Sequence, residues 1–112
     1  MAVINRDDLP YGGLSHELEG YLYGDVPACL IFFDGPPGSG PKLHRHPYAE
    51  IFVVQEGQAT FTLGEATIEA RAGQILIAPA GTPHKFVNSG SGRLRQLDIH
   101  TNDRFVTEWL ED

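Results

Sequence analysis

Short apolar runs, each bounded by turn residues, recur along the chain. Glycine and proline interrupt the sequence at short intervals, and the runs between them are rich in β-branched and aromatic residues. Runs of this kind predict strands. So many short strands at this spacing predict a single all-β domain, built as a sandwich or a barrel. We expect the strands over residues 28–33, 50–55, 59–63, 66–70, 74–77, 85–87 and 94–100.

The run that begins at Glu50 is apolar on both of its faces. Because side chains alternate along a strand, Glu50, Phe52 and Val54 share one face. Ile51 and Val53 share the other. If the face of Glu50 points inward, the outer face needs cover. That cover would come from an N-terminal strand, placed over residues 18–23, or from a second subunit.

The last run places polar side chains inside the domain. In residues 94–100, the alternation puts Gln96, Asp98 and His100 on one face, together with an apolar residue. Polar groups inside a protein need a partner or a function. Arg104 follows four residues after His100, so it is placed to pair with Asp98 or to project over the mouth of a pocket.

The C-terminal end carries a different periodicity. Phe105, Val106, Trp109 and Leu110 fall at positions that form one stripe on a helix. A polar residue at position 102 or 103 would cap the start of this helix. The chain then ends in two acidic residues, which have the wrong charge for a helix C-terminus. We therefore predict a short helix held by packing, with its aromatic residues over one opening or edge of the domain.

Composition narrows both the fold and the function. The chain has 112 residues, enough for one domain, and its 13 glycines and 8 prolines disfavour a helical bundle. A formal net charge of −7 argues against nucleic acid and anionic membranes as partners. The N-terminal residues lack the pattern of a secretory signal, and no apolar stretch is long enough to span a membrane. Since Cys29 is the only cysteine, no disulfide can form within the chain, and we expect a cytoplasmic protein.

Three histidines and one glutamate are candidate metal ligands. His44 and His46 are two residues apart, so in a strand their imidazoles project to the same face. Glu50 enters an apolar strand, where a charge needs a partner, and His84 lies further along the chain. Three neutral imidazoles and one carboxylate are a common ligand set for a divalent first-row metal, and a six-coordinate ion would keep two open positions. Taken singly, each residue has a plainer interpretation as a core histidine or a charge at a strand end.

The spacing around these residues is more specific than the residue types themselves. Residues 38–57 follow the pattern G-x5-H-x-H-x3-E-x6-G. Residues 73–88 follow the pattern G-x5-P-x-G-x2-H-x3-N. At a few per cent usage per residue type, chance agreement at all the fixed positions is on the order of 10⁻¹³. The two patterns resemble the two sequence motifs of the cupin superfamily.

This resemblance implies a fold and a metal site. The fold would be a small antiparallel β-barrel of the jelly-roll type, the double-stranded β-helix, as one cupin domain over residues 1–112. The C-terminal stripe adds a short helix to it. Cupins similar to this chain commonly dimerise through the outer face of the sheet, so we expect a homodimer. The resemblance also implies one divalent metal ion, which would be Mn, Fe, Co, Ni, Cu or Zn. Its ligands would be His44, His46, Glu50 and His84.

The last strand resembles that of small cupins that act on unsaturated uronate sugars. There an Asp, an aromatic residue two positions later and an Arg four positions beyond line the active site. Asp98, His100 and Arg104 have this spacing here, with His100 in place of the aromatic residue. The resemblance implies that these three are catalytic, with Asp98 or His100 as general acid or base and Arg104 on a substrate carboxylate. Since the metal site would be cationic, we expect a small anionic substrate.

Two classes of function follow from these observations. The first is a metal-dependent enzyme acting on a small oxygenated or sugar-like acid. Its chemistry would be that of an isomerase, lyase or hydratase with the metal as a Lewis acid, or that of a non-haem dioxygenase. The catalytic candidates on the last strand favour the non-redox chemistry, because it needs proton-transfer groups. The second class is a non-catalytic module that binds or senses a small molecule.

Overall fold

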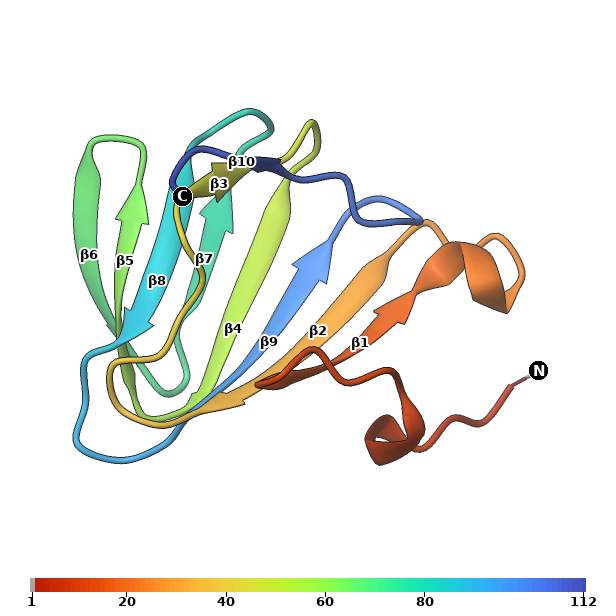
Figure 1. Ribbon diagram of the computed structural model, residues 1–112, viewed down its shortest axis with the longest axis horizontal. Helices are drawn as coiled ribbons and strands as arrows, with labels where there is room; N and C mark the ends of the chain where they lie inside the picture. The colour runs from red at the N-terminus through yellow and green to blue at the C-terminus, as the bar shows by residue number, and fades with distance from the viewer. Residues whose placement is uncertain (1) are drawn as a thin grey trace.

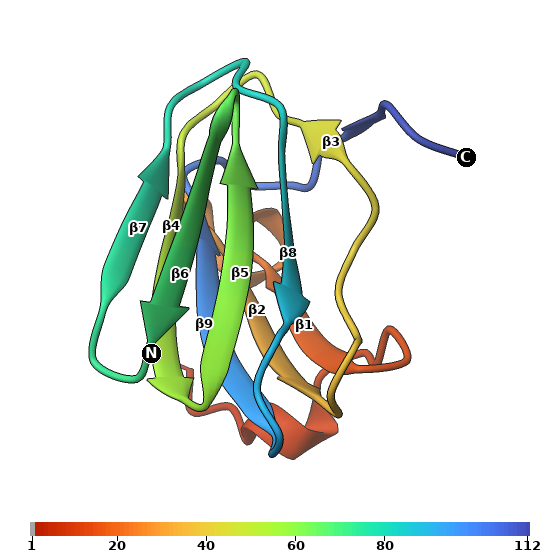
Figure 2. The same cartoon turned by 90° about the vertical axis from the view of Figure 1, so that its left-hand side faces the viewer.

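Two antiparallel sheets face each other across a common core. The computed structural model describes residues 2–112, in which ten strands form two five-stranded sheets (Figure 1). The first sheet has the strand order β1-β2-β9-β4-β7, and the second has the order β10-β3-β8-β5-β6 (Figure 2). The strands are β1 (Ser15–Glu19), β2 (Cys29–Gly35), β3 (His44–Arg45), β4 (Glu50–Glu56), β5 (Gln58–Leu63), β6 (Ala66–Arg71), β7 (Ile75–Ala78), β8 (His84–Asn88), β9 (Leu94–His100) and β10 (Glu108–Trp109).

The sequence prediction of an all-β jelly roll is confirmed, but the closed barrel is not. All seven expected runs form strands, within two residues of the expected bounds. Within residues 2–112, the hydrogen-bonded ladders remain two separate sheets, so the domain is an open sandwich. A sandwich buries the inward faces of both sheets equally well, because alternate side chains of each strand point between them.

Glycine shapes the hairpin that joins the two motifs. β5 and β6 form one antiparallel hairpin between Gly57 and Gly73, which have φ angles of 90° and 92°. Side chains other than glycine rarely adopt this left-handed conformation. A Cβ on Gly57 would also lie 2.3 Å from the carbonyl oxygen of Arg93. Both the torsion angle and the close approach therefore require glycine at position 57.

The hydrophobic core fills one end of the sandwich and leaves the other end polar. Phe52, Phe61 and Phe86 are buried, and the rings of Phe52 and Phe61 meet edge to face with centroids 5.1 Å apart. Further along β4, Val54 is also buried among these side chains. Glu50, at the first position of the same strand, is only 2% exposed. The inward face of β4 is thus charged at its first residue and apolar further along the strand.

The C-terminal segment does not form the helix that its apolar stripe predicts. Instead, β10 pairs with β3, so that Glu108 lies opposite Arg45 and Trp109 lies opposite His44. The Arg45 guanidinium donates two hydrogen bonds to the Glu108 carboxylate, 63 residues away in sequence. Leu110 N also donates to a backbone oxygen that precedes β3. Tertiary pairing supplies partners that the short acidic helix would lack, and it overrides the local pattern (Figure 1).

The N-terminal strand differs in place from its prediction. β1 ends at Glu19, and the chain continues into a short 3₁₀ helix, η2 (Gly20–Tyr23), while another, η1 (Arg6–Asp8), precedes β1. A Cβ on Gly20 would lie 2.0 Å from a backbone oxygen of the following loop, so the chain turns there in close contact. β1 pairs edge to edge with β2 and therefore extends the first sheet. It does not cover the outer face of that sheet.

Among residues 2–112, no helix is long and apolar enough to cross a membrane. Cys29 is a buried free thiol on β2. The cytoplasmic location expected from the sequence stays a prediction.

Candidate metal centre

Four of the residues singled out by the sequence meet at the polar end of the sandwich. The second sheet brings His44 on β3 directly opposite His84 on β8. His46 follows β3, and Glu50 begins β4 in the other sheet. One potential ligand atom from each of the four residues lies within 4.8 Å of the others, and all four side chains are buried. The fold therefore assembles a three-histidine, one-carboxylate cluster from both sheets.

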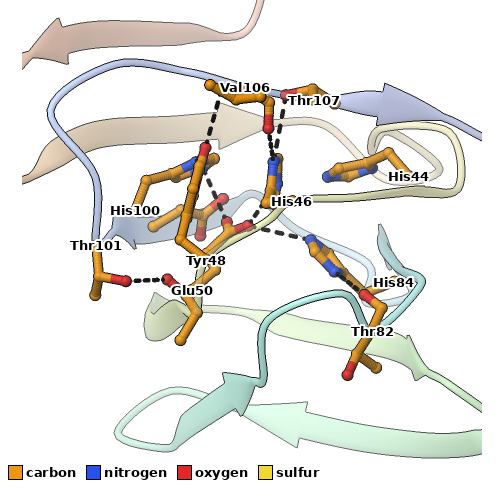
Figure 3. A network of polar contacts seen from close by, with 12 residues as sticks. His44, His46, Tyr48, Glu50, Thr82, His84, His100, Thr101, Val106 and Thr107 are labelled. Carbon is orange, nitrogen blue, oxygen red and sulfur yellow. Dashed lines mark hydrogen bonds and ion pairs between the residues drawn. The ribbon is translucent and has the colours of Figure 1, made fainter.

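Backbone carbonyl groups set the orientation of the three imidazoles. The Nδ1 atom of His44 lies 2.6 Å from Lys42 O, and that of His84 lies 2.9 Å from Thr82 O. His46 Nδ1 lies 2.9 Å from Val106 O (Figure 3). A carbonyl oxygen only accepts hydrogen bonds, so each Nδ1 must carry the proton. When such a ring is neutral, its Nε2 offers a lone pair, which is the arrangement found in histidine metal ligands.

The carboxylate of Glu50 lies among the imidazoles. Its Oε1 is 3.0 Å from His46 Nε2 and 3.1 Å from His84 Nε2, and its Oε2 is 3.2 Å from His100 Nε2. Burial raises the pKa of Glu50, but contacts with the three imidazoles outweigh burial and hold the pKa well below its usual range. The carboxylate is therefore the charged form, as a metal ligand must be.

The chemistry of the donor set fits a metal ion. Burial lowers the pKa of His44 to about 4, so this ring stays neutral at physiological pH. His46 Nε2 is buried and has no hydrogen-bond partner among the described residues, although Glu50 Oε1 lies nearby. A buried polar atom without a partner is costly, and a cation between this nitrogen and the carboxylate would satisfy both. The cluster thus suits one divalent transition metal.

A cavity of about 460 Å³ opens onto this cluster. Most of its other walls are apolar, and several are aromatic, with Phe52 and Phe86 on the inward face as the alternation of β4 and β8 predicts. No lysine or arginine is among the described residues that line it. Besides the four cluster residues, the lining residues are Gly12, Gly13, Leu14, Ser15, Glu17, Ile31, Phe33, Gly40, Pro41, Phe52, Phe86, Asp98, His100, Phe105, Thr107 and Trp109.

The last strand brings Asp98 and His100 to the cavity, as its alternation predicts. Both side chains are buried and line the cavity wall. Gln96 Nε2 donates a hydrogen bond of 2.7 Å to Asp98 Oδ1. Burial, and then the nearby charge of Glu50, raise the pKa of Asp98 well above its usual range. This environment favours the protonated form of Asp98 beside the candidate metal site.

Arg104 does not lie at the cavity with Asp98 and His100. Its side chain is exposed, and its Nε donates to Asp103 at 3.2 Å. Its guanidinium lies over the ring of Tyr21, 4.3 Å from the centroid. It is not among the residues that line the cavity. The turn that follows β9 directs Arg104 along the outside of η2, so the spacing from Asp98 does not translate into proximity at the pocket.

Tyr48 is a residue of the site that the sequence reasoning missed. Its ring stacks on His46, with centroids 5.0 Å apart and an interplanar angle of 12°. Its hydroxyl lies 2.6 Å from His100 Nδ1 and accepts a hydrogen bond of 3.3 Å from Val106 N. Tyr48 lies between two candidate ligands in sequence, which is the only signal that would have found it.

The C-terminal segment is also part of the site. Phe105 packs edge to face against His100, and Trp109 lies beside His44 with ring centroids 5.0 Å apart. Both aromatic rings line the cavity, together with Thr107. Sequence reasoning expected Phe105 and Trp109 to cover an opening of the domain. The structure places them at the cavity, but on an extended segment rather than on a helix.

Comparisons with known proteins agree with this geometry. The family model described as a cupin domain matches residues 31–100, more than half of the chain. An uncharacterized protein of Methanocaldococcus jannaschii is 36% identical over 77 residues, covering 68% of this chain and 62% of that protein. The HTH-type transcriptional regulator PuuR of Escherichia coli is 31% identical over 108 residues, covering 92% of this chain and 58% of the regulator. The chain therefore spans about three fifths of the length of these relatives.

Solved structures show the same fold at lower identity. An uncharacterized protein with a double-stranded β-helix domain from Klebsiella pneumoniae has a TM-score of 0.77 at 20% identity, covering 98% of this chain and 92% of that one. Oxalate decarboxylase of Bacillus subtilis, described with Mn(II) centres, has a TM-score of 0.81 at 20% identity, covering 93% and 30%. With both motifs, the open jelly roll and the four-residue cluster in place, the chain belongs to the cupin-domain family.

Proposed function

We propose that this protein is a metal-dependent enzyme that acts on a small oxygenated acid by isomerase, lyase or hydratase chemistry. The observation that carries this proposal is the position of the four-residue cluster, which forms one wall of a 460 Å³ cavity. Four protein ligands leave positions open on a six-coordinate ion, as catalytic metal sites do. A cavity of this size admits a small molecule next to those positions.

His44, His46, Glu50 and His84 would hold the ion. A bound divalent metal ion supplies Lewis-acid chemistry, which polarises a substrate oxygen atom. Aromatic side chains form much of the cavity wall, so the surroundings of the ion would be largely apolar. The metal is one of Mn, Fe, Co, Ni, Cu and Zn, since imidazole and carboxylate donors accept all of them.

Asp98 is the residue that we assign as general acid and base. Its carboxyl group lines the cavity and is fixed by the hydrogen bond from Gln96. The raised pKa keeps a proton on Asp98 that it can deliver to a substrate and later recover. His100 was the second candidate from the sequence, but both of its ring nitrogens face protein groups, Tyr48 and Glu50. Arg104 is too far outside the cavity lining to receive a role here.

The cavity lining refines the expected substrate. The sequence predicts an anionic molecule, yet the cavity offers no lysine or arginine among the described residues. The metal ion would then be the positive group that receives an anionic oxygen. The remaining walls favour an apolar body, since Ile31, Phe33 and Trp109 contribute apolar surface. We propose a small hydroxy or keto acid with an apolar side chain.

A non-catalytic binding or sensing module is the second candidate function. The observation that favours it is the similarity to a transcriptional regulator over 92% of this chain. In such a module, the same cavity would bind a small molecule without turnover. A dioxygenase would use the same four ligands, and oxygen consumption separates it from the non-redox enzyme.

We also propose that the protein is a homodimer. The outer face of the first sheet carries apolar side chains in two rows that cross its strands. Ile75 and Ile77, at one edge of this face, are 63% and 59% exposed. The rows contain no charged side chain, so a second copy of the same face matches them without bringing two acidic surfaces together. The rows are Leu18, Leu30, Ile99, Ile51 and Ile77, and next to them Phe32, Leu97, Val53 and Ile75.

Turnover experiments on the metal-loaded protein test the enzymatic proposal. Small hydroxy and keto acids are incubated with and without dioxygen, and the products are followed by NMR. We expect the same turnover in both conditions and a loss of about 100-fold in kcat for Asp98→Asn. Asp103→Asn is the matched control, because Asp103 is partly exposed and pairs with Arg104.

The other outcomes separate the alternatives. Turnover that needs dioxygen would replace the proposal with a dioxygenase, and binding without turnover would favour the sensing module. Normal activity in Asp98→Asn would remove Asp98 from the mechanism.

A further inference from the structure

The histidines around Glu50 fall into two classes, according to what lies next to Nδ1. For His44, His46 and His84, that neighbour is a backbone carbonyl oxygen, which forces the proton onto Nδ1. For His100, the neighbour is the hydroxyl of Tyr48, at 2.6 Å. A hydroxyl can donate as well as accept, so this imidazole has a choice of tautomer that the other three lack.

The surroundings of Tyr48 favour the tautomer in which His100 Nδ1 accepts. Val106 N lies 3.3 Å from the hydroxyl oxygen, and a backbone N–H only donates. The tyrosine oxygen therefore accepts from Val106 and has its own proton left to give. His100 Nδ1 is the acceptor for that proton, at 2.6 Å. With Nδ1 accepting, the proton of the neutral His100 ring resides on Nε2.

The Nε2 atom of His100 lies next to the outer oxygen of Glu50. The Nε2 atom lies 3.2 Å from Glu50 Oε2 (Figure 3). Without a metal ion this contact does not form a hydrogen bond, so Nε2 is a buried atom with no hydrogen-bond partner among the described residues. Oε1 is the oxygen that faces His46 and His84. The two oxygens of one carboxylate thus face different imidazoles, those of His46 and His84 on one side and that of His100 on the other.

We propose that Tyr48 is a positioning residue that keeps His100 as an N–H donor to Glu50 Oε2. This has two consequences for the metal site, and it rests on the metal binding proposed above. Glu50 would bind the ion through Oε1 alone, because His100 would donate its N–H to Oε2. His100 itself stays off the metal, because its Nε2 carries a proton where a ligand needs a lone pair. The open positions next to the cavity are then left for the substrate.

Tautomer assignment by NMR tests this proposal directly. The ¹⁵N shifts of the histidine rings distinguish Nδ1–H from Nε2–H, and they are measured in the zinc-loaded and the metal-free protein. We expect Nδ1–H for His44, His46 and His84, and Nε2–H for His100. Tyr48→Phe keeps the ring that stacks on His46 and removes only the hydroxyl, so it should turn His100 into a mixture of tautomers.

Zinc affinity gives a second readout. Loss of a group that orients a metal ligand typically weakens metal binding by 10-fold or more, so we expect about a tenfold loss for Tyr48→Phe and for His100→Leu. His100→Gln places an amide N–H near the position of Nε2 and should stay close to the wild type. Tyr23→Phe is the matched control, because Tyr23 is exposed on η2 and does not line the cavity.

The outcomes of these measurements are distinct. An Nδ1–H tautomer at His100 in the wild type would overturn the proposal, and so would unchanged ring shifts and affinity in Tyr48→Phe. If the wild type binds no zinc, the proposed function fails. The tautomer of His100 in the metal-free protein then still decides the role of Tyr48.

Discussion

At the scale of single residues, the geometry of the site depends on which atom lies within hydrogen-bond distance of Nδ1 in each buried imidazole ring. Backbone oxygens at three points orient three imidazoles toward one place, and a tyrosine hydroxyl orients a fourth ring differently. The residue types and spacing of His44, His46, Glu50 and His84 were sufficient to predict that these four meet. The role of Tyr48 was not predictable in this way, because its partner Val106 lies 58 residues away in sequence.

The buried Asp98 predicts a pH dependence of stability. Its pKa is raised in the folded chain, whereas in the unfolded chain it is near 3.9. Between these two values the folded state holds a proton that the unfolded state has released. Stability therefore falls as the pH rises from about 4 through the raised pKa, by about 1.4 kcal/mol for each unit between the two values.

Urea unfolding of the metal-free protein measures this contribution. We expect the free energy of unfolding of the wild type to fall relative to that of Asp98→Asn between pH 4 and pH 8, since the amide does not titrate. Groups that do not interact with Asp98 titrate alike in both proteins, so their effects cancel in the difference. A difference that stays constant over this range would show that Asp98 is ionised in the folded chain.

At the scale of elements, strands were predictable and the two ends of the chain were not. Alternation and glycine punctuation specify β5 and β6, because these strands pair with each other across a short turn. β10 has only two residues and pairs with β3 from the far end of the chain. A two-residue strand has no periodicity to detect. The C-terminal apolar residues have the spacing of a helical stripe, but they lie on an extended segment. Two of them, Phe105 and Trp109, line the cavity.

Replacing the hairpin glycine at position 57 should lower the stability of the folded chain. Gly57→Ala places a Cβ 2.3 Å from Arg93 O and forces alanine into a φ of 90°. We expect a loss of about 2 to 4 kcal/mol in the free energy of unfolding, because both backbone strain and a steric clash contribute. Gly92→Ala is the control, since no atom lies within 4 Å of its Cβ position. Equal stabilities of the two variants in urea would show that the hairpin relaxes freely.

At the scale of the whole molecule, the uncovered face of the first sheet is the main feature beyond the site. The sequence predicted that this face would need cover. In the structure β1 extends the sheet instead of covering it, so the second subunit remains as the proposed cover. Ile77→Lys places a charge within the two apolar rows and should shift the protein toward monomers at micromolar concentration.

Light scattering after size-exclusion chromatography measures this shift. Ile68→Lys is the control, because Ile68 is also exposed but lies on β6 in the other sheet. A wild-type protein with the mass of a monomer at this concentration would rule out the dimer.

The proposed metal site also depends on the fold of the whole domain. Both sheets contribute ligands, so the metal site forms only when the two layers face each other. Metal binding should therefore stabilise the folded chain by mass action, as any ligand of the native state does.

Metal stoichiometry tests the central claim most directly. The purified protein is loaded with Zn²⁺ or Mn²⁺, freed of excess ion by gel filtration and analysed by plasma mass spectrometry, beside His84→Ala and His16→Ala. His16 is the control, because it lies on β1 and is not part of the cluster. We predict one ion per chain for the wild type and for His16→Ala, and far less for His84→Ala. Far less than one ion in the wild type, or full binding in His84→Ala, would contradict the account.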